Sequence, residues 1–548
     1  MSRHDGQPTY LRSNPSPRRR QNRHSRPQRR RQPARQGYTS SRPPRSSTRY
    51  LGVLVVLAIV VAALGAGWIL TRPLTLTLTA TPADATIRFA AASQEATGTL
   101  TAGDLRPGSY SIEVGRSGFA TQTVEVEVER FATNRFEVAL EALPWDVSVT
   151  TKPEGAICTL TRDGVELLGG PSALSGQVTA GPAVLRVTHD GYNVVERELF
   201  IEGPTPVEVW LDPKGQILRG VRTITTLGAP KGVSVTPDGS EAWTSILNGP
   251  PSIEIFDPRT GAKIGEVDIG THGAVEVIFN NAGTLAYTSQ METAKCYEID
   301  VKTRKVIREF DTESAWTKWV SLSPDEKTLY ASNWSGDDVS IINLSTGELV
   351  SRVRVSNTPR GMYATADGKS LYVAGFDSGD LERIDLATGE VTALYTDGGA
   401  LRHIVGDEAT GRLFISDMSR NVVLVHDIAA GTTKKFVDTD QKPNTIDLTP
   451  DGKLLFVSCR GANNPKSYYI PGPEWGSILV FDTTTGEGLD AVIAGNQPTA
   501  LDVSDDGKLL VFSDFLDNRL RVYEIPPYEE FAAGGGGRFE ARLAEIRK

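Results

Sequence analysis

The sequence predicts an all-β chain: a seven-bladed β-propeller preceded by two small β-sandwich modules, with one N-terminal transmembrane helix and a disordered N-terminal arm. Three observations predict this architecture. A strand-rich segment of about 72 residues is duplicated in tandem, a unit of about 42 residues recurs seven times, and one run of 20 residues carries no charge. Internal repeats of these lengths indicate small modules and propeller blades.

The first 50 residues contain 14 Arg, no Lys and one Asp, and they are rich in Pro, Ser and Gln. With so few apolar side chains to bury, residues 1–50 are predicted to form a disordered, Arg-rich cytoplasmic arm. We interpret the arm as a topology determinant that rests on anionic lipid, in preference to a docking arm for a nucleic acid or a protein. The rest of the chain has 44 basic and 66 acidic residues, a net charge of −22.

The apolar run LGVLVVLAIVVAALGAGWIL follows the arm at Leu51–Leu70. At about 1.5 Å per residue it spans a hydrocarbon core of about 30 Å, and cleaved signal peptides have a shorter apolar region. Residues 51–71 are therefore predicted to be a transmembrane signal-anchor helix. The Arg-rich side should stay in the cytoplasm, which places the C-terminal domains outside it, in the periplasm or on the cell surface.

Two copies of one pattern follow the apolar run. The first copy has a Pro-x-x-Ala turn at Pro82–Ala85 and a Gly-aromatic pair at Gly118-Phe119, and the second has them at Pro153–Ala156 and Gly191-Tyr192. The offsets are 71 and 73 residues. Runs such as LTLTLT and VEVEVE alternate apolar and polar residues, which is typical of strands with one wet face.

This pattern resembles PEGA domains. The second copy spells the signature as Pro153-Glu154-Gly155-Ala156, whereas the first has Ala83-Asp84 in place of Glu-Gly. The resemblance implies two small β-sandwich modules of the kind found in surface and envelope proteins, at residues 72–142 and 143–213. Neither copy carries a catalytic constellation, so we interpret both as spacers or adhesion modules.

From residue 214 a shorter period begins. Each unit reads as strand, Asp-Gly-type turn, strand, loop, strand, Asp-x-x-Thr-Gly turn and strand, and the glycines supply the positive φ of such hairpins. Four short strands repeated seven times predict a seven-bladed propeller over residues 214–530. A Gly-rich linker and a short helix are expected at 531–548. The turn positions are Gly239, Gly283, Glu326, Gly368, Gly411, Gly452 and Gly507.

The seventh unit ends at RLRVYEI and lacks its outer strand, whereas Gln216–Leu227 is one unpaired strand ahead of the first unit. We predict that this strand completes the last blade and closes the ring, which also removes an exposed edge. The repeats resemble YVTN-family propellers over about Gln216 to Tyr528. The nearest matches to the motif of that family are Leu371-Tyr372-Val373-Ala374 and Leu329-Tyr330-Ala331-Ser332.

Ligands of propellers usually bind at one mouth of the channel, where the innermost strands begin. Four of the seven corresponding positions are basic, and converging Arg and Lys attract carboxylate or phosphate. The alternative is a solvated, variable rim. The seven positions are Lys231, Val275, Lys318, Arg360, Arg402, Asn444 and Thr499. The predicted ligand-binding residues are Lys231, Lys318, Arg360, Arg402, His403, Trp334, Tyr468 and Trp475, the last two from an insertion in the sixth unit that suits a lid.

The sequence favours a membrane-anchored envelope protein whose propeller is a non-catalytic binding platform for a protein, a glycan or a small anion. No catalytic residue, cofactor or metal is expected: the three cysteines are scattered, and there is no HExxH, GxSxG or P-loop. Nucleic acid is not the expected partner. One alternative is a lactonase-like hydrolase, although Glu276 is the only acid near the mouth; another is a purely structural envelope protein.

Overall fold

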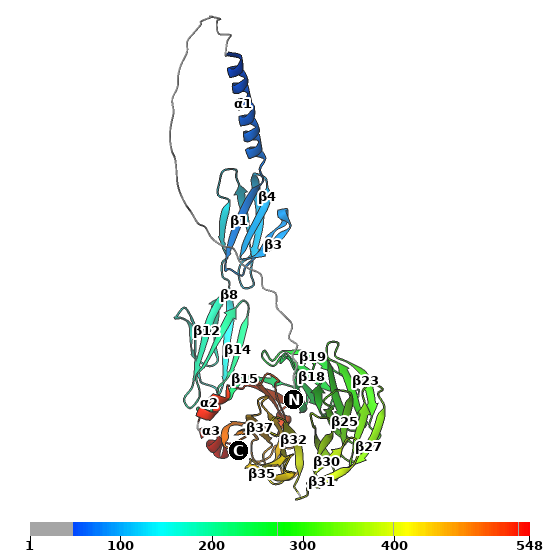
Figure 1. Ribbon diagram of the computed structural model, residues 1–548. Coiled ribbons are helices and arrows are strands. Elements are labelled where there is room, and N and C mark those ends of the chain that lie inside the picture. The colour runs from blue at the N-terminus through cyan, green and yellow to red at the C-terminus, as the bar shows by residue number, and fades with distance from the viewer. Residues whose placement is uncertain (1–47, 271, 398, 535) are drawn as a thin grey trace, which may run out of the picture. The chain divides into compact units, whose positions relative to one another are not determined.

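The computed structural model describes residues 48–270, 272–397, 399–534 and 536–548 (Figure 1). The predicted arm, up to residue 47, lies outside the described residues. By internal contacts the chain divides into two units. One holds residues 48–77, 101–110 and 127–134, and the other holds the remaining described residues.

Helix α1 (Thr48–Thr71) contains the apolar run and begins three residues before it. Its stretch Gly52–Thr71 has a mean hydropathy of 2.8, and by length and composition it could cross a membrane. Its apolar side chains are exposed, among them Leu64 and Trp68. Only Arg72 and Pro73 separate α1 from the first strand.

The first module is built from two sheets, with strand orders β4-β1-β7 and β3-β2-β5-β6. Burial along β1 alternates, so that Leu76 and Leu78 are fully buried, and in β2 Ile87 and Phe89 are fully buried too. The elements are β1 (Leu74–Thr81), β2 (Thr86–Phe89), the 3-10 turn η1 (Ala90–Ala92), β3 (Gln94–Thr97), β4 (Thr99–Leu105), β5 (Gly108–Gly115), β6 (Gln122–Val128) and β7 (Arg135–Ala139).

The second module repeats this plan, with sheets β11-β8-β14 and β10-β9-β12-β13. Its core contains Val149, Cys158, Leu160 and Leu185, all fully buried. The two modules are therefore sandwiches with one topology, as the duplicated pattern predicted. The strands are β8 (Pro144–Lys152), β9 (Ile157–Arg162), β10 (Val165–Pro171), β11 (Leu174–Thr179), β12 (Gly181–Thr188), β13 (Val195–Ile201) and β14 (Thr205–Trp210).

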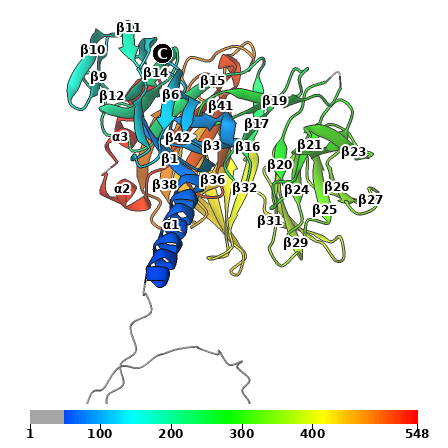
Figure 2. The same cartoon turned by 90° about the horizontal axis from the view of Figure 1, so that it is seen from above.

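Seven four-stranded antiparallel sheets follow, which confirms the predicted propeller. Figure 2 shows the strands of blades 2, 3 and 4 next to one another. Blades 1 and 2 contain β16 (Pro230–Val235), β17 (Ala242–Ile246), β18 (Ile253–Phe256), β19 (Lys263–Val267), β20 (Val277–Phe279), β21 (Leu285–Gln290), β22 (Lys295–Asp300) and β23 (Lys305–Asp311). Blades 3 and 4 contain β24 (Thr317–Leu322), β25 (Thr328–Asn333), β26 (Asp338–Asn343), β27 (Leu349–Arg354), β28 (Pro359–Ala364), β29 (Ser370–Gly375), β30 (Leu381–Asp385) and β31 (Val391–Tyr395). Blades 5 and 6 contain β32 (Leu401–Asp407), β33 (Arg412–Asp417), β34 (Val422–Asp427), β35 (Thr432–Asp438), β36 (Pro443–Leu448), β37 (Leu454–Cys459), β38 (Ser477–Asp482) and β39 (Gly488–Ile493).

The seventh blade is completed from the other end of the chain. It contains β40 (Pro498–Val503), β41 (Leu509–Asp514) and β42 (Arg519–Glu524), and its outer strand is β15 (Arg219–Thr225), antiparallel to β42. The predicted closure is therefore confirmed. A hydrogen bond also joins blade 7 to blade 1: Asp502 Oδ2 accepts the backbone N–H of Val235 at 2.7 Å.

Serine hydroxyls join neighbouring blades near the start of the inner strands. In four blades a serine of the second strand donates to a carbonyl on the next blade, at 2.6 to 2.9 Å. The pairs are Ser245 to Val275, Ser289 to Lys318, Ser332 to Arg360 and Ser416 to Asn444. These bonds show that the four carbonyl positions are structurally equivalent.

The acids of the Asp-x-x-Thr-Gly turns cap those turns. Asp257 Oδ1 accepts the N–H groups of Arg259 and Thr260, and Asp385 Oδ1 accepts those of Ala387 and Thr388. Hydrogen bonds to the ionised form favour it, and the pKa of Asp385 is lowered by its bonds to Thr388. These two acids of the repeated turns therefore have a structural role.

Two short helices follow the last blade, α2 (Tyr528–Ala533) and α3 (Gly537–Glu545). The Phe531 side chain of α2 is fully buried in the core of blades 6 and 7. In α3, Phe539 packs edge-on against Phe481, and Arg542 forms a buried ion pair with Asp440 at 3.2 Å. The expected linker is short, because α3 already begins at Gly537.

The closing strand should be essential to stability. Ile224 of β15 is 3% exposed and packs in the core that blade 7 shares with blade 1. Ile224→Ala should lower the free energy of unfolding by about 2–5 kcal/mol. Ile307→Ala, at a half-exposed position of β23, is the matched control and should cost less than about 0.5 kcal/mol. Urea unfolding that gave equal losses for the two variants would contradict the role of β15.

Candidate functional site: the basic mouth of the propeller

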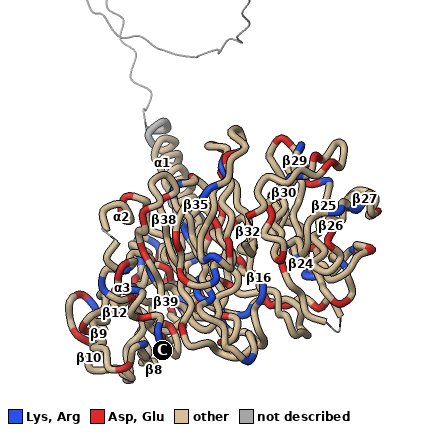
Figure 3. Tube along the Cα trace, turned by 90° about the horizontal axis from the view of Figure 1, so that it is seen from below, with Lys and Arg blue, Asp and Glu red and all other residues tan. Residues whose placement is uncertain are grey.

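Five cationic side chains gather where the inner strands begin, and we call them the basic ring. Three of them are almost fully buried: Arg360, Arg402 and Arg460 are 3%, 7% and 8% exposed. The two lysines are partly buried. Figure 3 shows Lys and Arg positions in blue near β16, on the inside of the ring of blades. The basic ring consists of Lys231, Lys318, Arg360, Arg402 and Arg460.

One carboxylate partly neutralises the basic ring. Arg360 Nη2 lies 2.6 Å from Glu276 Oε1, and both side chains are nearly buried. Among the described residues no other member of the ring has a carboxylate oxygen within 4.0 Å. The mouth therefore carries an excess of positive charge in a chain whose described part is otherwise acidic.

Several buried polar atoms at the mouth lack a partner. Within the described residues, Nη1 of Arg360 and Nε of Arg402 and Arg460 make no hydrogen bond. The side-chain amide oxygen and nitrogen of Asn444, which is fully buried, also make no hydrogen bond. Unsatisfied buried polar groups are uncommon in native proteins, and they occur at sites that a water, an ion or a ligand completes.

Burial and mutual repulsion disfavour the charges of the ring. Burial, then Arg360 and Arg402, lower the pKa of Lys318 to about 6. Burial, then Arg402 and Arg460, lower the pKa of Lys231 well below the usual range for lysine. The pKa of Arg402 is also lowered, chiefly by burial. A nearby anion would oppose these shifts, because an opposite charge favours the charged form.

An aromatic side chain faces each member of the ring. Lys318 Nζ lies 3.3 Å from the centre of the Trp334 ring, and Trp334 in turn packs against Phe376 at 5.0 Å. Such contacts offset part of the cost of an unpaired cation. The remaining contacts, at 5.0 to 5.9 Å, are Lys231 with Phe515, Arg360 with Trp319, Arg402 with Phe376 and Arg460 with Tyr468.

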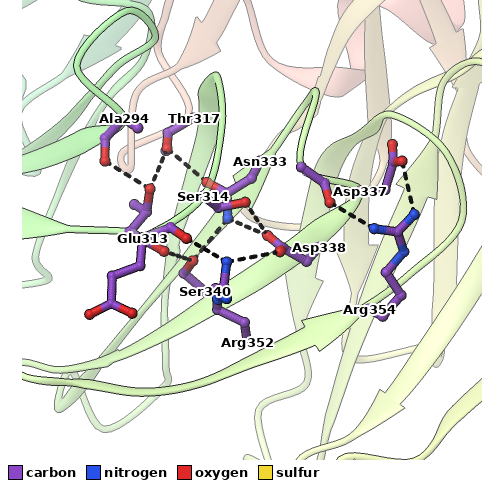
Figure 4. Close-up of polar contacts among 12 residues, drawn as sticks. Ala294, Glu313, Ser314, Thr317, Asn333, Asp337, Asp338, Ser340, Arg352 and Arg354 are labelled. Carbon is purple, nitrogen blue, oxygen red and sulfur yellow. Dashed lines mark hydrogen bonds and ion pairs between the residues drawn. The ribbon is translucent and has the colours of Figure 1, made fainter.

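A buried polar network joins Thr317, Asn333, Asp338 and Ser340 (Figure 4). Thr317 Oγ1 donates to Asn333 Oδ1 at 2.7 Å, and Asn333 Nδ2 donates to Asp338 Oδ1 at 2.7 Å and to Ser340 Oγ at 2.8 Å. Thr317 and Asn333 directly precede Lys318 and Trp334 in the chain. The network therefore holds the ends of β24 and β25 in one geometry.

Most of the predicted ligand-binding residues lie at this mouth, but two have other surroundings. His403 packs edge-on against Trp319, and its Nδ1 accepts the N–H of Ile446 at 3.2 Å. Burial lowers the pKa of His403 to about 3, so its imidazole is neutral. Trp475 contacts the C-terminal segment: its backbone N–H donates to the carbonyl of Ile546, and Lys548 Nζ lies over its ring.

Arg460 was not among the predicted ligand-binding residues, although the sequence carries a signal for it. Arg460 is the first residue after β37, and Trp334, Phe376 and Phe515 occupy the same place after β25, β29 and in blade 7. The backbone N–H of each bonds to the loop that precedes its own inner strand, for example Arg460 to Lys442. In these four blades the first residue after the second strand therefore faces the mouth as well.

The opposite end of the channel has a different character. A cavity of about 680 Å³ reaches from Glu276, Trp319 and His403, beside the basic ring, to Asp447 and Asp502 at this other end of the inner strands. Burial raises the pKa of Asp447 to about 6, and burial together with Asp447 raises that of Asp502. Both carboxylates accept backbone N–H groups from the following blade. Asp447 and Asp502 therefore join neighbouring blades and belong to the framework of the propeller.

The arrangement at the basic mouth suits anion binding better than acid–base catalysis. Glu276 is paired with Arg360, and His403 accepts a backbone hydrogen bond, so neither is a free general base in this geometry. Among the described residues no group of three or more His, Cys, Asp or Glu could hold a metal ion. The three cysteines are buried, and burial raises their pKa values.

The fold and the site define a seven-bladed β-propeller with a basic channel mouth. Residues 274–405, from blade 2 to the first strand of blade 5, match the family described as "Lactonase, 7-bladed beta-propeller". The chain is 37% identical over 259 residues to Antigen Lp49 of Leptospira interrogans serogroup Icterohaemorrhagiae serovar copenhageni (strain Fiocruz L1-130). The matched part is 46% of this chain and 57% of that relative, so the chain spans little more than half of the relative.

Similarity to solved structures is weaker. A chain described as Kuenenia stuttgartiensis Hydrazine Synthase aligns with a TM-score of 0.48 and 19% identity. The alignment covers 55% of this chain and 97% of that chain. The family match supports a β-propeller.

The shifted pKa of Lys318 predicts a pH dependence. Between pH 6 and the usual range for lysine, the unfolded chain binds more protons than the folded chain, so stability should rise with pH. Lys318→Met should be more stable than the wild type at pH 6, and the difference should shrink by at most about 1.4 kcal/mol per pH unit up to pH 9. Urea unfolding at several pH values measures this, with Lys327→Met at an exposed turn as control. A constant difference between pH 6 and 9 would contradict it.

The two buried arginines should respond differently to substitution. Arg360→Met leaves the Glu276 carboxylate buried without its cation, which should cost about 3–5 kcal/mol. Arg402→Met removes a cation that has no carboxylate partner within 4.0 Å among the described residues, so the free energy of unfolding should stay equal or rise. The urea midpoints of the two variants provide the measurement. A larger loss for Arg402→Met than for Arg360→Met would show that the charges are not balanced in this way.

Proposed function

We propose that the protein is anchored in the membrane by α1 and displays its propeller outside the cytoplasm as a non-catalytic binding platform for an anionic ligand. The observation that carries this proposal is the basic ring: five basic side chains converge on one mouth, and among the described residues one carboxylate lies within ion-pair distance of them. Repulsion within the ring is a cost that an acidic ligand would relieve. Convergent cations in a confined site also attract anions over a distance.

The ligand-binding residues of this proposal are Lys231, Lys318, Arg360 and Arg402, with Trp334 and Tyr468 beside them. We include Arg460 among them because of its position at the mouth and its contact with Tyr468. His403 and Trp475 would act by holding neighbouring parts in place rather than by touching the ligand. The ligand could be an acidic segment of an envelope protein, an acidic glycan or a small anion.

The anchor and the location rest on separate support. The Arg-rich arm precedes the apolar helix, which favours a cytoplasmic N-terminus and extracytoplasmic C-terminal domains. The resemblance of the modules to PEGA domains and of the propeller to YVTN-family repeats favours the cell envelope. The arm itself would rest on anionic lipid.

A lactonase-like hydrolase is the second candidate, favoured by the family match at residues 274–405. In that case Glu276 would be the acid nearest the basic ring, and its pairing with Arg360 would have to open. A purely structural envelope protein, without a ligand, is the third. Acid release from gluconolactone, followed in a weakly buffered solution, separates the second candidate from the others when Glu276→Gln is the control.

The proposed binding is tested on the soluble chain from residue 72 onward. A thermal-shift screen of phosphate, uronic acids, peptidoglycan fragments and polyglutamate should find acidic ligands that raise the melting temperature. Affinity should fall with added salt, because charge pairs are screened beyond a Debye length of about 8 Å at physiological ionic strength.

The variant Lys231→Met with Arg402→Met should lose this binding. The matched control is Lys327→Met with Lys508→Met, two turn lysines whose side chains are 72% and 71% exposed. The control should bind like the wild type. Ligands that are neutral or cationic, or that bind the Lys231→Met, Arg402→Met variant as well as the wild type, would show that the basic ring is only a solvated rim.

A further inference from the structure

The loop between β6 and β7 in the first module has a feature that the propeller does not explain. Phe131 is 83% exposed, the highest value for a large apolar side chain among the described residues. Its φ of 72° lies in the left-handed region, which residues other than glycine seldom adopt. A strained backbone that presents an aromatic side chain to the surroundings is a reason to look for a contact there.

The same loop is tied to the end of α1. Arg130 Nη1 donates to the carbonyl of Ile69 at 2.7 Å and to that of Arg72 at 2.9 Å. The last carbonyls of a helix lack intrahelical partners, and a cation is favourable beside them. Arg130 thereby caps the helix. All of these residues lie in one compact unit.

The loop is held rigidly in this position. The Asn134 side chain accepts the N–H of Glu129 at 3.0 Å and donates to its carbonyl at 3.1 Å, which closes the loop at its base. The N–H of Thr77, in β1, donates to the carbonyl of Asn134 at 2.9 Å. The conformation of Phe131 is therefore fixed by contacts on both sides.

The end of α1 coincides with a membrane boundary if the helix spans the bilayer. The 20 residues Gly52–Thr71 rise about 30 Å, which is the thickness of the hydrocarbon core. Two residues, Arg72 and Pro73, join α1 to β1 and can reach at most about 7 Å. The capped carbonyls and the adjoining Phe131 thus lie at the depth of the outer interface.

The composition of this end of the module fits an interface. Trp68 is 60% exposed, and the Arg72 guanidinium lies over its ring at 3.6 Å. Arg106 is exposed in the turn between β4 and β5, where its backbone is held by the Tyr110 hydroxyl. Aromatic rings and arginines are enriched at the level of lipid headgroups. Asp104 and Glu129 at the same end show that the surface is amphipathic rather than simply basic.

We propose that the loop Glu129–Asn134 is a membrane-contact loop, in which Phe131 enters the boundary between headgroups and acyl chains of a phospholipid bilayer and Arg130 joins the loop to the end of α1. The proposal rests on the proposed membrane anchoring of α1. The first module would then be seated on the outer leaflet and not suspended above it.

The test uses the full chain in phosphatidylcholine vesicles. Phe131→Cys carries an NBD fluorophore, and the three native cysteines are buried and should stay unlabelled in the folded protein. Ala83→Cys is the matched control, because it follows the far end of the eight-residue strand β1, about 26 Å along the chain from α1. NBD at position 131 should be quenched by lipids with a spin label near the top of the acyl chain, and NBD at position 83 should not.

Arg130→Gln in the Phe131→Cys background should reduce the quenching, because the loop is no longer tied to the helix. Flotation of the same samples separates the two levels of the proposal. Protein that floats with the vesicles but shows equal quenching at positions 131 and 83 would overturn the contact loop and leave the anchor intact. Protein that does not float would overturn the anchor and, with it, the contact loop.

Discussion

The closure of the ring by β15 on β42 is the interaction on which the rest of the propeller depends. It pairs the first strand of the repeat region with the last and leaves the seventh sheet with four strands like the others. Closure places the starts of all inner strands around one axis, so residues that lie about 42 positions apart in the chain become neighbours. The serine hydroxyls between blades and the bond from Asp502 to Val235 then fix the spacing of those starts.

Charge at the mouth follows from that geometry. Lysines and arginines that would be unremarkable on separate surface loops are brought together under aromatic side chains, where water is partly excluded and repulsion is stronger. Glu276 balances Arg360 alone, and the rings of Trp334, Phe376, Tyr468 and Phe515 compensate the others in part. The result is a set of donors that are held in place before any ligand arrives, which lowers the ordering cost of binding.

Much of this architecture could be predicted from the repeats, because turn glycines and strand patterns report local structure. The seven units, the closing strand and the equivalence of Lys318, Arg360 and Asn444 follow from counting along the chain. Contacts between blades could not be counted in this way. The pairing of Arg360 with Glu276 joins residues 84 positions apart across two blades. Trp475 was predicted at the mouth, but its position depends on the C-terminal segment, whose docking no repeat encodes.

The strand that closes the ring is also the strand by which the chain enters the propeller. Any tension transmitted from the N-terminal modules reaches first the bonds from the N–H groups of Ile217 and Leu218 to Asp490 of blade 6, and then the pairing of β15 with β42. The seventh sheet is therefore the point at which pulling would open the ring, while the six sheets made from consecutive strands have no free end to pull. A propeller closed in this way has a mechanical polarity: a pull from its N-terminal side acts directly on the strand pairing of the seventh sheet, and the other six sheets are reached only after it.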